Sequence, residues 1–151
     1  MPQTLSCVYL HIVFSTKNRV GFLQDAVLRE KTHAYLAGIV AQQNCPAVHV
    51  GGVSDHVHLL VRFGRDTTQS DLLRELKRSS SVWVKQQPGG HDDFSWQNGA
   101  GLFSVGPRNV GGVRRYIEKQ ETHHRAESFQ DELRDLFRRS GMEWDERYVW
   151  D

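Results

Sequence analysis

Two histidines stand one residue apart inside an apolar run, His56 and His58 in VSDHVHLLV (residues 53–61). Side chains of an extended strand alternate faces with a period of two, so we expect both imidazoles to point the same way and Val57 and Leu59 to point the other way. Two neighbouring imidazoles can chelate a divalent cation, and they are a poor choice for simple packing. By itself such a pair is a weak indication of a metal site, so other residues must complete it.

A tyrosine and a glutamine stand four residues apart in VRRYIEKQETHH (residues 113–124). In a helix this spacing puts Tyr116 and Gln120 one turn apart on the same face. His123 falls on roughly that face one turn further on, with His124 at its edge. A helical tyrosine on its own is most often a packing residue. Beside metal-binding side chains it becomes a candidate nucleophile.

Together, the strand and helix residues suggest a division of labour for phosphoryl transfer. His56, His58 and Gln120 could hold a divalent ion through two imidazole nitrogens and one amide oxygen. The ion would neutralise the anionic oxygens of a phosphodiester, and neutral ligands would leave its full charge and open positions for the substrate. A phenol has a pKa of about 10, so Tyr116 attacks only if the site helps to remove its proton. Unlike water, a tyrosine would keep the cleaved DNA end attached for rejoining.

The elements that must position these residues alternate between strand and helix. The expected strands cover residues 5–16, 47–53, 56–63 and 102–106, and the expected helices cover residues 24–43, 67–87, 113–124 and 129–141. The order β-α-β-β-α-β-α-α is typical of the α+β ferredoxin-like (RRM-like) fold, an antiparallel sheet with helices on one face, here with added C-terminal helices. We interpret Gly51-Gly52 as a β-bulge and PRNVGG (107–112) as a flexible joint.

Length and composition predict one domain spanning residues 1–151. Apolar residues make up 38% and charged residues 25%, which is typical of a soluble globular protein. No apolar run approaches the ~18–20 residues of a membrane helix, and the N-terminus has no signal-peptide pattern, so we expect no membrane association. Cys7 and Cys45 form no CxxC pair, which favours a reduced, cytoplasmic protein.

The charge is distributed unevenly along the chain. The net charge is only +1, yet residues 61–88 and residues 108–125 each carry a surplus of three positive charges, while the chain from Ala126 onward is net minus four. The two basic segments could face a polyanion such as DNA, and scattered solvated charge is an equally good interpretation.

The same residues resemble a known family. His56-Val57-His58 with the following Leu59-Leu60-Val61 resembles the HUH motif, and YIEKQ (116–120) resembles the YIxxQ helix of the single-tyrosine (Y1) transposases of the IS200/IS605 group. The likeness extends to HIVFSTKNRV (11–20), WQNGAGLFSVG (96–106) and HHRAESFQDELRDLF (123–137), and so covers nearly the whole chain. One departure is that Ala100 stands where related sequences often have an aromatic residue.

This resemblance implies a metal-dependent DNA transposase. By the motif match, His56 and His58 would bind a divalent cation, magnesium or manganese, with Gln120 as the third protein ligand. Magnesium prefers oxygen ligands, so two imidazoles favour manganese or a shell that phosphate and water complete. Tyr116 matches the nucleophile, which attacks single-stranded DNA and forms a 5′-phosphotyrosine link before strand transfer.

The resemblance also implies partners and motion. We expect the substrate to be single-stranded DNA with hairpin ends, in the cytoplasm of a prokaryote and close to its nucleoid. Members of the family are homodimers in which the tyrosine helix of one subunit can complete the histidine site of the other. We interpret Gly106-Pro107 and Gly111-Gly112 as a hinge for that helix, with an ordinary loop as the alternative. The candidates for contacts with DNA phosphates are Lys77, Arg78, Arg114 and Arg115.

Three other functions remain open. A ferredoxin-like sheet is also typical of non-catalytic nucleic-acid-binding modules, although the sequence lacks their aromatic RNP pattern. An HUH nickase, including a domesticated relative acting on repeat palindromes, would differ only in its target. A structural zinc protein would use a site built from His56, His58, His123 and His124.

The remaining candidates receive plainer interpretations. The acidic C-terminal tail ends in DERYVWD, where Tyr148 and Trp150 could dock on a partner or cover the site. We expect the other histidines and two N-terminal residues to be ordinary surface or packing residues: His11, His33, His49, His91, Cys7 and Tyr9.

Overall fold

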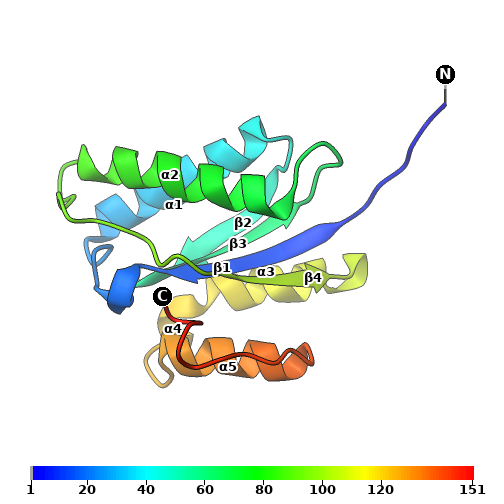
Figure 1. The fold of residues 1–151 in the computed structure, drawn as a ribbon. Helices are drawn as coiled ribbons and strands as arrows, with labels where there is room; N and C mark the ends of the chain where they lie inside the picture. Colours follow the sequence, from blue (N-terminus) through cyan, green and yellow to red (C-terminus); the bar gives the residue numbers. More distant parts are fainter. Residues whose placement is uncertain (1) are drawn as a thin grey trace.

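The fold is a four-stranded antiparallel sheet between two layers of helices (Figure 1). The computed structural model describes residues 2–151, and the strand order is β2-β3-β1-β4. The strands are β1 (Tyr9–Ser15), β2 (Ala47–Gly52), β3 (His56–Arg62) and β4 (Gly101–Val105). The helices are α1 (Ala26–Gln42), α2 (Gln69–Lys85), α3 (Val110–Glu118), α4 (Gln120–His123) and α5 (Phe129–Arg139). The structure therefore confirms the predicted α+β fold.

One face of the sheet is mainly apolar and packs against α1 and α2. In β3 the residues on this face are Val57, Leu59 and Val61, and each is fully buried. The same cluster contains residues of the neighbouring strand and both helices, namely Leu10, Ile12, Phe14, Leu28, Leu36, Leu72 and Leu76. Burial of these side chains supplies the main driving force for folding.

The opposite face packs against α3, α4 and α5 in two separate apolar clusters. Val13 and Phe103 contact the apolar stripe of α5, and Leu60 and Val105 contact Ile117 of α3. The strand histidines belong to neither apolar cluster, although they lie on this face of the sheet. The topology therefore places a buried polar group between the sheet and the three C-terminal helices.

The β2 strand corrects the predicted bulge. Its register with β3 shifts between Ala47 and His49, not at Gly51-Gly52. Gly51 serves a different purpose, because a Cβ atom there would lie 2.8 Å from Cγ2 of Ile117. The missing side chain lets α3 approach the sheet closely, which brings the tyrosine helix over the strand histidines.

The predicted helix over residues 113–124 differs in both its start and its continuity. Pro107–Asn109 form a 3₁₀ turn and α3 begins at Val110, so PRNVGG is helical rather than a flexible joint. The helix is then interrupted at Lys119, whose φ of −96° and ψ of 15° are not helical, and α4 resumes for one turn. Gln120, the first residue after this break, is buried.

The two ends of the chain behave differently. Residues 2–8 precede β1, which begins later than predicted, and they extend away from the body (Figure 1). The C-terminal tail folds back, and Arg19 Nη1 donates to the carbonyl of Trp150 while the Gly99 N–H donates to that of Asp151. Trp150 packs against Phe129 at the start of α5. Among residues 2–151, no helix is long and apolar enough to cross a membrane.

Candidate functional site

The two strand histidines lie as the sequence predicted, side by side on one face of β3. Both side chains are completely buried, and their ring centroids are 5.2 Å apart. In the antiparallel pairing with β1, His56 stands opposite Ser15 and His58 stands opposite Val13. Full burial of two imidazoles requires polar partners, and these partners define the site.

A carboxylate of α5 that the sequence analysis did not select lies at the centre of the site. Glu132 is 2% exposed, and its Oε1 lies 3.0 Å from Nε2 of His58 and 3.0 Å from Nε2 of His124. The same oxygen lies 3.4 Å from Nε2 of His56. Three imidazole nitrogens from two elements therefore converge on one oxygen.

The second oxygen of this carboxylate faces the tyrosine helix. Glu132 Oε2 accepts a hydrogen bond from the Tyr116 hydroxyl and another, at 3.0 Å, from Nε2 of Gln120. The amide oxygen of Gln120 lies 3.1 Å from Nε2 of His56. The structure thus brings together all four residues that the sequence selected for chemistry, and it does so within one chain.

This arrangement can hold a metal ion. The ligand atoms of His56, His58, His124 and Glu132 all lie within 4.8 Å of one another. Three imidazole nitrogens and one carboxylate oxygen form a donor set that suits divalent transition metals such as manganese or zinc. His124, and not His123, joins the group, which differs from the set considered for a structural zinc site.

The outer nitrogen of each strand histidine is also held. Nδ1 of His56 lies 2.7 Å from Oδ1 of Asp55, and Nδ1 of His58 lies 2.8 Å from Nε2 of His11. Such contacts fix the tautomer and orientation of a metal-binding imidazole. His11 was predicted to be an ordinary histidine, but it is 4% exposed and belongs to the site through His58.

These different partners give the two histidines opposite pKa shifts. Burial disfavours the charged form of His56, but hydrogen bonds to Asp55 and Glu132 outweigh burial and raise its pKa to about 9. Burial dominates at His58 and lowers its pKa to about 4. Burial, reinforced by His58, likewise lowers the pKa of His11 to about 3, so His11 stays neutral.

The pKa values of Tyr116 and Glu132 are shifted in opposite directions. Burial and the negative charge of Glu132 raise the pKa of Tyr116 well above its usual range. The pKa of Glu132 lies well below its usual range, because hydrogen bonds from His124, His56 and His58 outweigh the effect of burial. Before a cation binds, the phenol is therefore protonated and the carboxylate is ionised.

A signal for Glu132 does exist in the sequence. The apolar stripe of α5 consists of Phe129, Leu133 and Phe137, all buried. Glu132 precedes Leu133 on the buried side of this amphipathic helix, where an acid needs a polar partner. An acid on an apolar stripe could therefore have been singled out, although its partners could not.

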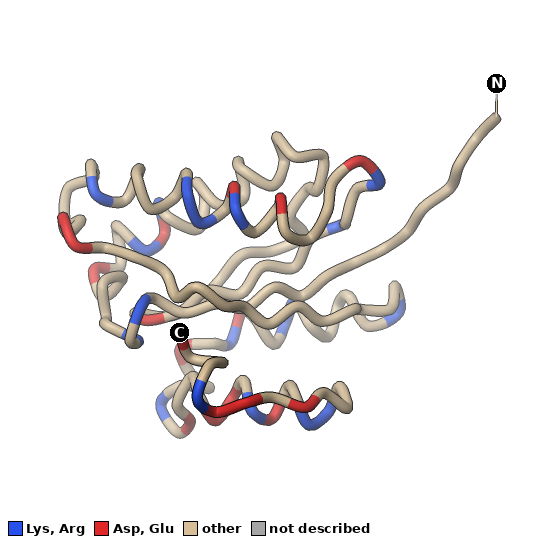
Figure 2. The backbone as a smooth tube through the Cα atoms, viewed as in Figure 1, with Lys and Arg blue, Asp and Glu red and all other residues tan. Residues whose placement is uncertain are grey.

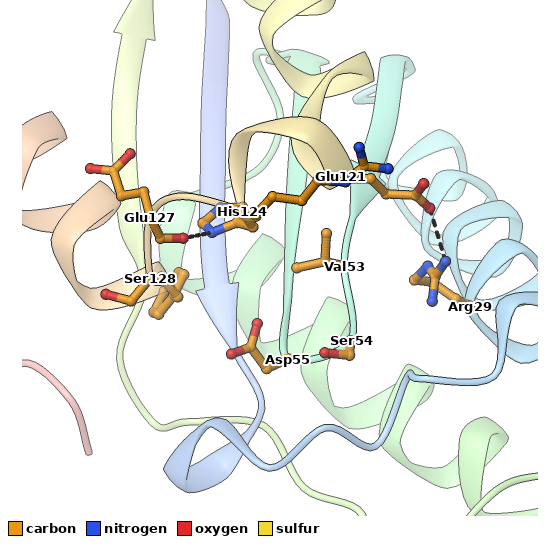
Figure 3. Close-up of a pocket in the computed structure, with 10 residues that line it drawn as sticks. Arg29, Val53, Ser54, Asp55, Glu121, His124, Glu127 and Ser128 are labelled. Atoms are coloured by element: carbon orange, nitrogen blue, oxygen red, sulfur yellow. Dashed lines mark hydrogen bonds and ion pairs between the residues drawn. The ribbon is translucent and has the colours of Figure 1, made fainter.

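A cavity of about 470 Å³ opens beside the histidine group. Figure 3 shows its lining, with Asp55 on the turn before β3 and His124 across from it. Arg29 and Glu121 form an ion pair of 3.0 Å at its side. Because Asp55 and His124 both contact ligand candidates, this cavity gives solvent a route to the edge of the site.

The candidate DNA contacts do not form one surface. Lys77 and Arg78 belong to α2, and Arg114 and Arg115 belong to α3 on the opposite side of the sheet; Figure 2 shows basic residues in both layers. The Lys77 amine donates three hydrogen bonds to backbone carbonyls of residues 97–99. Its pKa falls to about 8 because of burial. Lys77 thus has no free donor for a phosphate, whereas the other three side chains are exposed.

Comparisons with known proteins identify similar sequences and structures. The sequence matches the family described as "Transposase IS200 like" over residues 4–120. A structure described as a transposase from Deinococcus radiodurans R1 is similar at 23% identity, with a TM-score of 0.58, over 80% of this chain and 95% of that one. A REP-associated tyrosine transposase bound to a REP hairpin is similar at 12% identity, with a TM-score of 0.59, over 82% of this chain and 72% of that one. No curated protein matches the chain.

At these identities the two structures show a shared fold, while the family match covers most of the chain, including both strand histidines, Tyr116 and Gln120. The chain therefore belongs to the family of IS200-like transposases.

Proposed function

We propose that the protein is a metal-dependent transposase that cleaves and rejoins single-stranded DNA with Tyr116 as its nucleophile. The observation that carries this proposal is the convergence of the Tyr116 hydroxyl and the strand histidines on a single carboxylate. This convergence supports the proposal, because transesterification requires a nucleophile next to a cation-binding group.

The chain's own residues account for most of the reaction. His56, His58 and Gln120 would hold a magnesium or manganese ion, which would supply charge neutralisation at the phosphate when bound. The Tyr116 oxygen forms a bond to phosphorus, and the bond from phosphorus to the 3′-oxygen breaks. The phenolic proton is lost and the leaving 3′-oxygen gains a proton, so a free 3′-hydroxyl and a 5′-phosphotyrosine remain. Attack by a second 3′-hydroxyl reverses the step and joins a new strand.

We propose that the substrate carries hairpins near the cleavage sites and lies in the nucleoid of a prokaryotic cytoplasm. The similar structure with a bound REP hairpin supports this substrate class. The same likeness favours one second candidate, a nickase of this chemistry that acts on dispersed repeat palindromes. The two candidates share every residue named above and differ only in target.

We further propose a homodimer in which the tyrosine helix can exchange between subunits. Tyr116 lies beside the histidines of its own chain, with a ring-centroid distance of 5.9 Å to His58. Exchange would therefore require α3 to move. Gly106-Pro107, at the start of the 3₁₀ turn that leads into α3, is the hinge we propose for this motion. Gly111 and Gly112 lie within α3 itself.

The decisive experiment detects the covalent intermediate. The protein is incubated with labelled single strands of the DNA that flanks its gene, with manganese or magnesium, and SDS-resistant adducts are resolved on a gel. We expect an adduct with the wild-type protein and none with Tyr116→Phe or with chelator. Tyr148→Phe is the matched control, because Tyr148 is 64% exposed and lies outside the site.

The same experiment separates the alternatives. DNA binding without an adduct, with either metal, would indicate a non-catalytic binding module. Cooperative unfolding on addition of chelator would indicate a structural zinc protein. Adducts on repeat palindromes but not on the ends of a mobile element would favour the nickase.

A further inference from the structure

The two oxygens of Glu132 face different halves of the proposed reaction. Oε1 is surrounded by Nε2 atoms of the cation-binding histidines, at 3.0 Å from both His58 and His124. Oε2 bonds to the Tyr116 hydroxyl and to Nε2 of Gln120. One rigid carboxylate group therefore connects the cation-binding side of the site to the nucleophile.

The burial of this acid is explained only by the site. Its side-chain hydrogen bonds go to Tyr116, Gln120, His58 and His124, and Nε2 atoms of His56 and His123 each lie 3.4 Å from one of its oxygens. A buried carboxylate is costly unless it is paired and hydrogen-bonded, and replacing buried ionic groups with apolar residues of similar volume is often neutral or stabilising. The acid therefore contributes to what the site does rather than to the stability of α5.

The position of Glu132 is also suited to binding a cation, and not only to holding Tyr116 in place. The ligand atoms of Glu132, His56, His58 and His124 all lie within 4.8 Å of one another, and Glu132 is the only acidic residue of the four. An anionic oxygen gives a manganese or magnesium ion the hard ligand that imidazoles do not provide. Its second oxygen remains free to hold a hydrogen bond while the first binds a cation.

We propose that Glu132 is both a cation ligand, through Oε1, and the positioning residue for the nucleophile, through Oε2. This inference rests on the proposed function, since it assigns a role within that reaction. It extends the site to α5, which lies beyond the matched residues 4–120. The distance between the cation-bound phosphate and the phenol is then set by the geometry of a single side chain.

The test measures cation binding and adduct formation separately. Glu132→Gln keeps the size of the side chain and removes the charge, and Asp131→Asn makes the same change at an exposed neighbour on α5. Manganese affinity is measured by electron paramagnetic resonance titration of the free ion, without DNA. The rate of adduct formation is measured at saturating manganese, so that weaker binding does not contribute.

We expect Glu132→Gln to lower manganese affinity by at least about 10-fold and to slow adduct formation at saturating manganese by about 100-fold. Asp131→Asn should match the wild-type protein in both measurements. Tyr116→Phe should leave manganese affinity within about twofold, because the tyrosine contacts only Oε2. Unchanged affinity in Glu132→Gln would overturn the ligand role, and an unchanged rate at saturating manganese would overturn the positioning role.

The manganese titration tests the role of Glu132 even if the proposed function is wrong, and a second variant covers a failure to fold. If the wild-type protein forms no adduct, the proposed function fails, while the manganese titration still decides the ligand role. If Glu132→Gln does not fold, Glu132→Asp replaces it, because it keeps the charge but its shorter side chain cannot reach both the histidines and Tyr116. A wild-type adduct rate for the folded Glu132→Asp protein would overturn the positioning role.

Discussion

The two faces of strand β3 differ as much as any two regions of this molecule. Toward α1 and α2 the strand presents Val57, Leu59 and Val61, which are buried in an apolar cluster. Toward α3, α4 and α5 it presents His56 and His58, whose every ring nitrogen has a polar partner. Neighbouring residues of one strand thus serve stability on one face and chemistry on the other.

The apolar face explains how a small domain can hold a set of buried polar groups. Burying two imidazoles and a carboxylate costs free energy that the site recovers only partly. The apolar face, with its continuous cluster across two strands and two helices, supplies the surplus. Substitutions on the two faces should therefore have separable effects, on unfolding for one and on cation binding for the other.

The largest effect on stability is expected from Leu59→Ala. Leu59 is fully buried in the apolar cluster, and truncation of such a residue lowers the free energy of unfolding by about 2–5 kcal/mol. Urea denaturation followed by circular dichroism measures this loss. Manganese affinity, corrected for the folded fraction, should remain unchanged. A large loss of affinity in the folded protein would show that the two faces are not independent.

A smaller effect, confined to the polar face, is expected from His11→Phe. Phenylalanine fills the volume of His11 beside Phe103. When Nε2 of His58 binds a cation, its Nδ1–H needs an acceptor, which Nε2 of His11 provides and phenylalanine does not. Loss of such a supporting contact typically lowers metal affinity 10- to 100-fold, or about 1.4–2.7 kcal/mol. Calorimetric titration with manganese measures it.

The control for this prediction is His11→Gln, whose amide oxygen can still accept a hydrogen bond. It should lose less affinity than His11→Phe. Equal losses in both variants would mean that His11 acts through packing alone.

How much of this site the sequence predicts depends on which contacts are local. The shared face of His56 and His58 follows from the period of a strand, and the pairing of Tyr116 with Gln120 follows from helical spacing. His11 and Glu132 could not be placed in the same way, because their contacts depend on strand register and on how α5 docks. The break at Lys119 was also missed, since the tertiary contacts of Gln120 outweigh the helical pattern.

The fold shows the same division. The order and type of the strands and of helices α1, α2 and α5 were predicted from periodicity. In the structure, Thr68 and Ser128 cap the first turns of α2 and α5. The glycines were misinterpreted because their effect is non-local. Gly51 allows α3 to approach the sheet, and Gly111-Gly112 lie within a helix that tertiary packing stabilises.

His56 and His58 should change the stability of the protein in opposite pH ranges, because their pKa values shift in opposite directions. His58, with its pKa lowered to about 4, contributes stability that is present above the unfolded pKa of 6.5 and lost as the pH falls toward 4. His56, with its pKa raised to about 9, contributes stability that is present below pH 6.5 and lost as the pH rises toward 9. The melting temperature of the metal-free protein should therefore be highest near pH 6.5.

Asp55→Asn tests this assignment. Removing the carboxylate lowers the pKa of His56, so the melting temperature should fall less between pH 6.5 and 9 than in the wild-type protein, while the limb below pH 6.5 is unchanged. Thermal melts across this range measure both limbs. An alkaline limb as steep as that of the wild-type protein would contradict the assignment of His56.

The smallest effect concerns the outer surfaces of the two helical layers, where Arg115 and Lys77 were predicted alike as phosphate contacts. Arg115 is exposed on the helix that carries Tyr116, so Arg115→Ala should weaken single-strand binding and reduce the slope of log affinity against log salt by about one. The Lys77 amine instead joins α2 to the carbonyls of residues 97–99, so Lys77→Ala should lower the melting temperature and leave that slope unchanged. Fluorescence anisotropy at several salt concentrations decides between them. A reduced slope for Lys77→Ala would mean that its amine leaves those carbonyls for DNA, and that the layer beyond the apolar face also contacts the substrate.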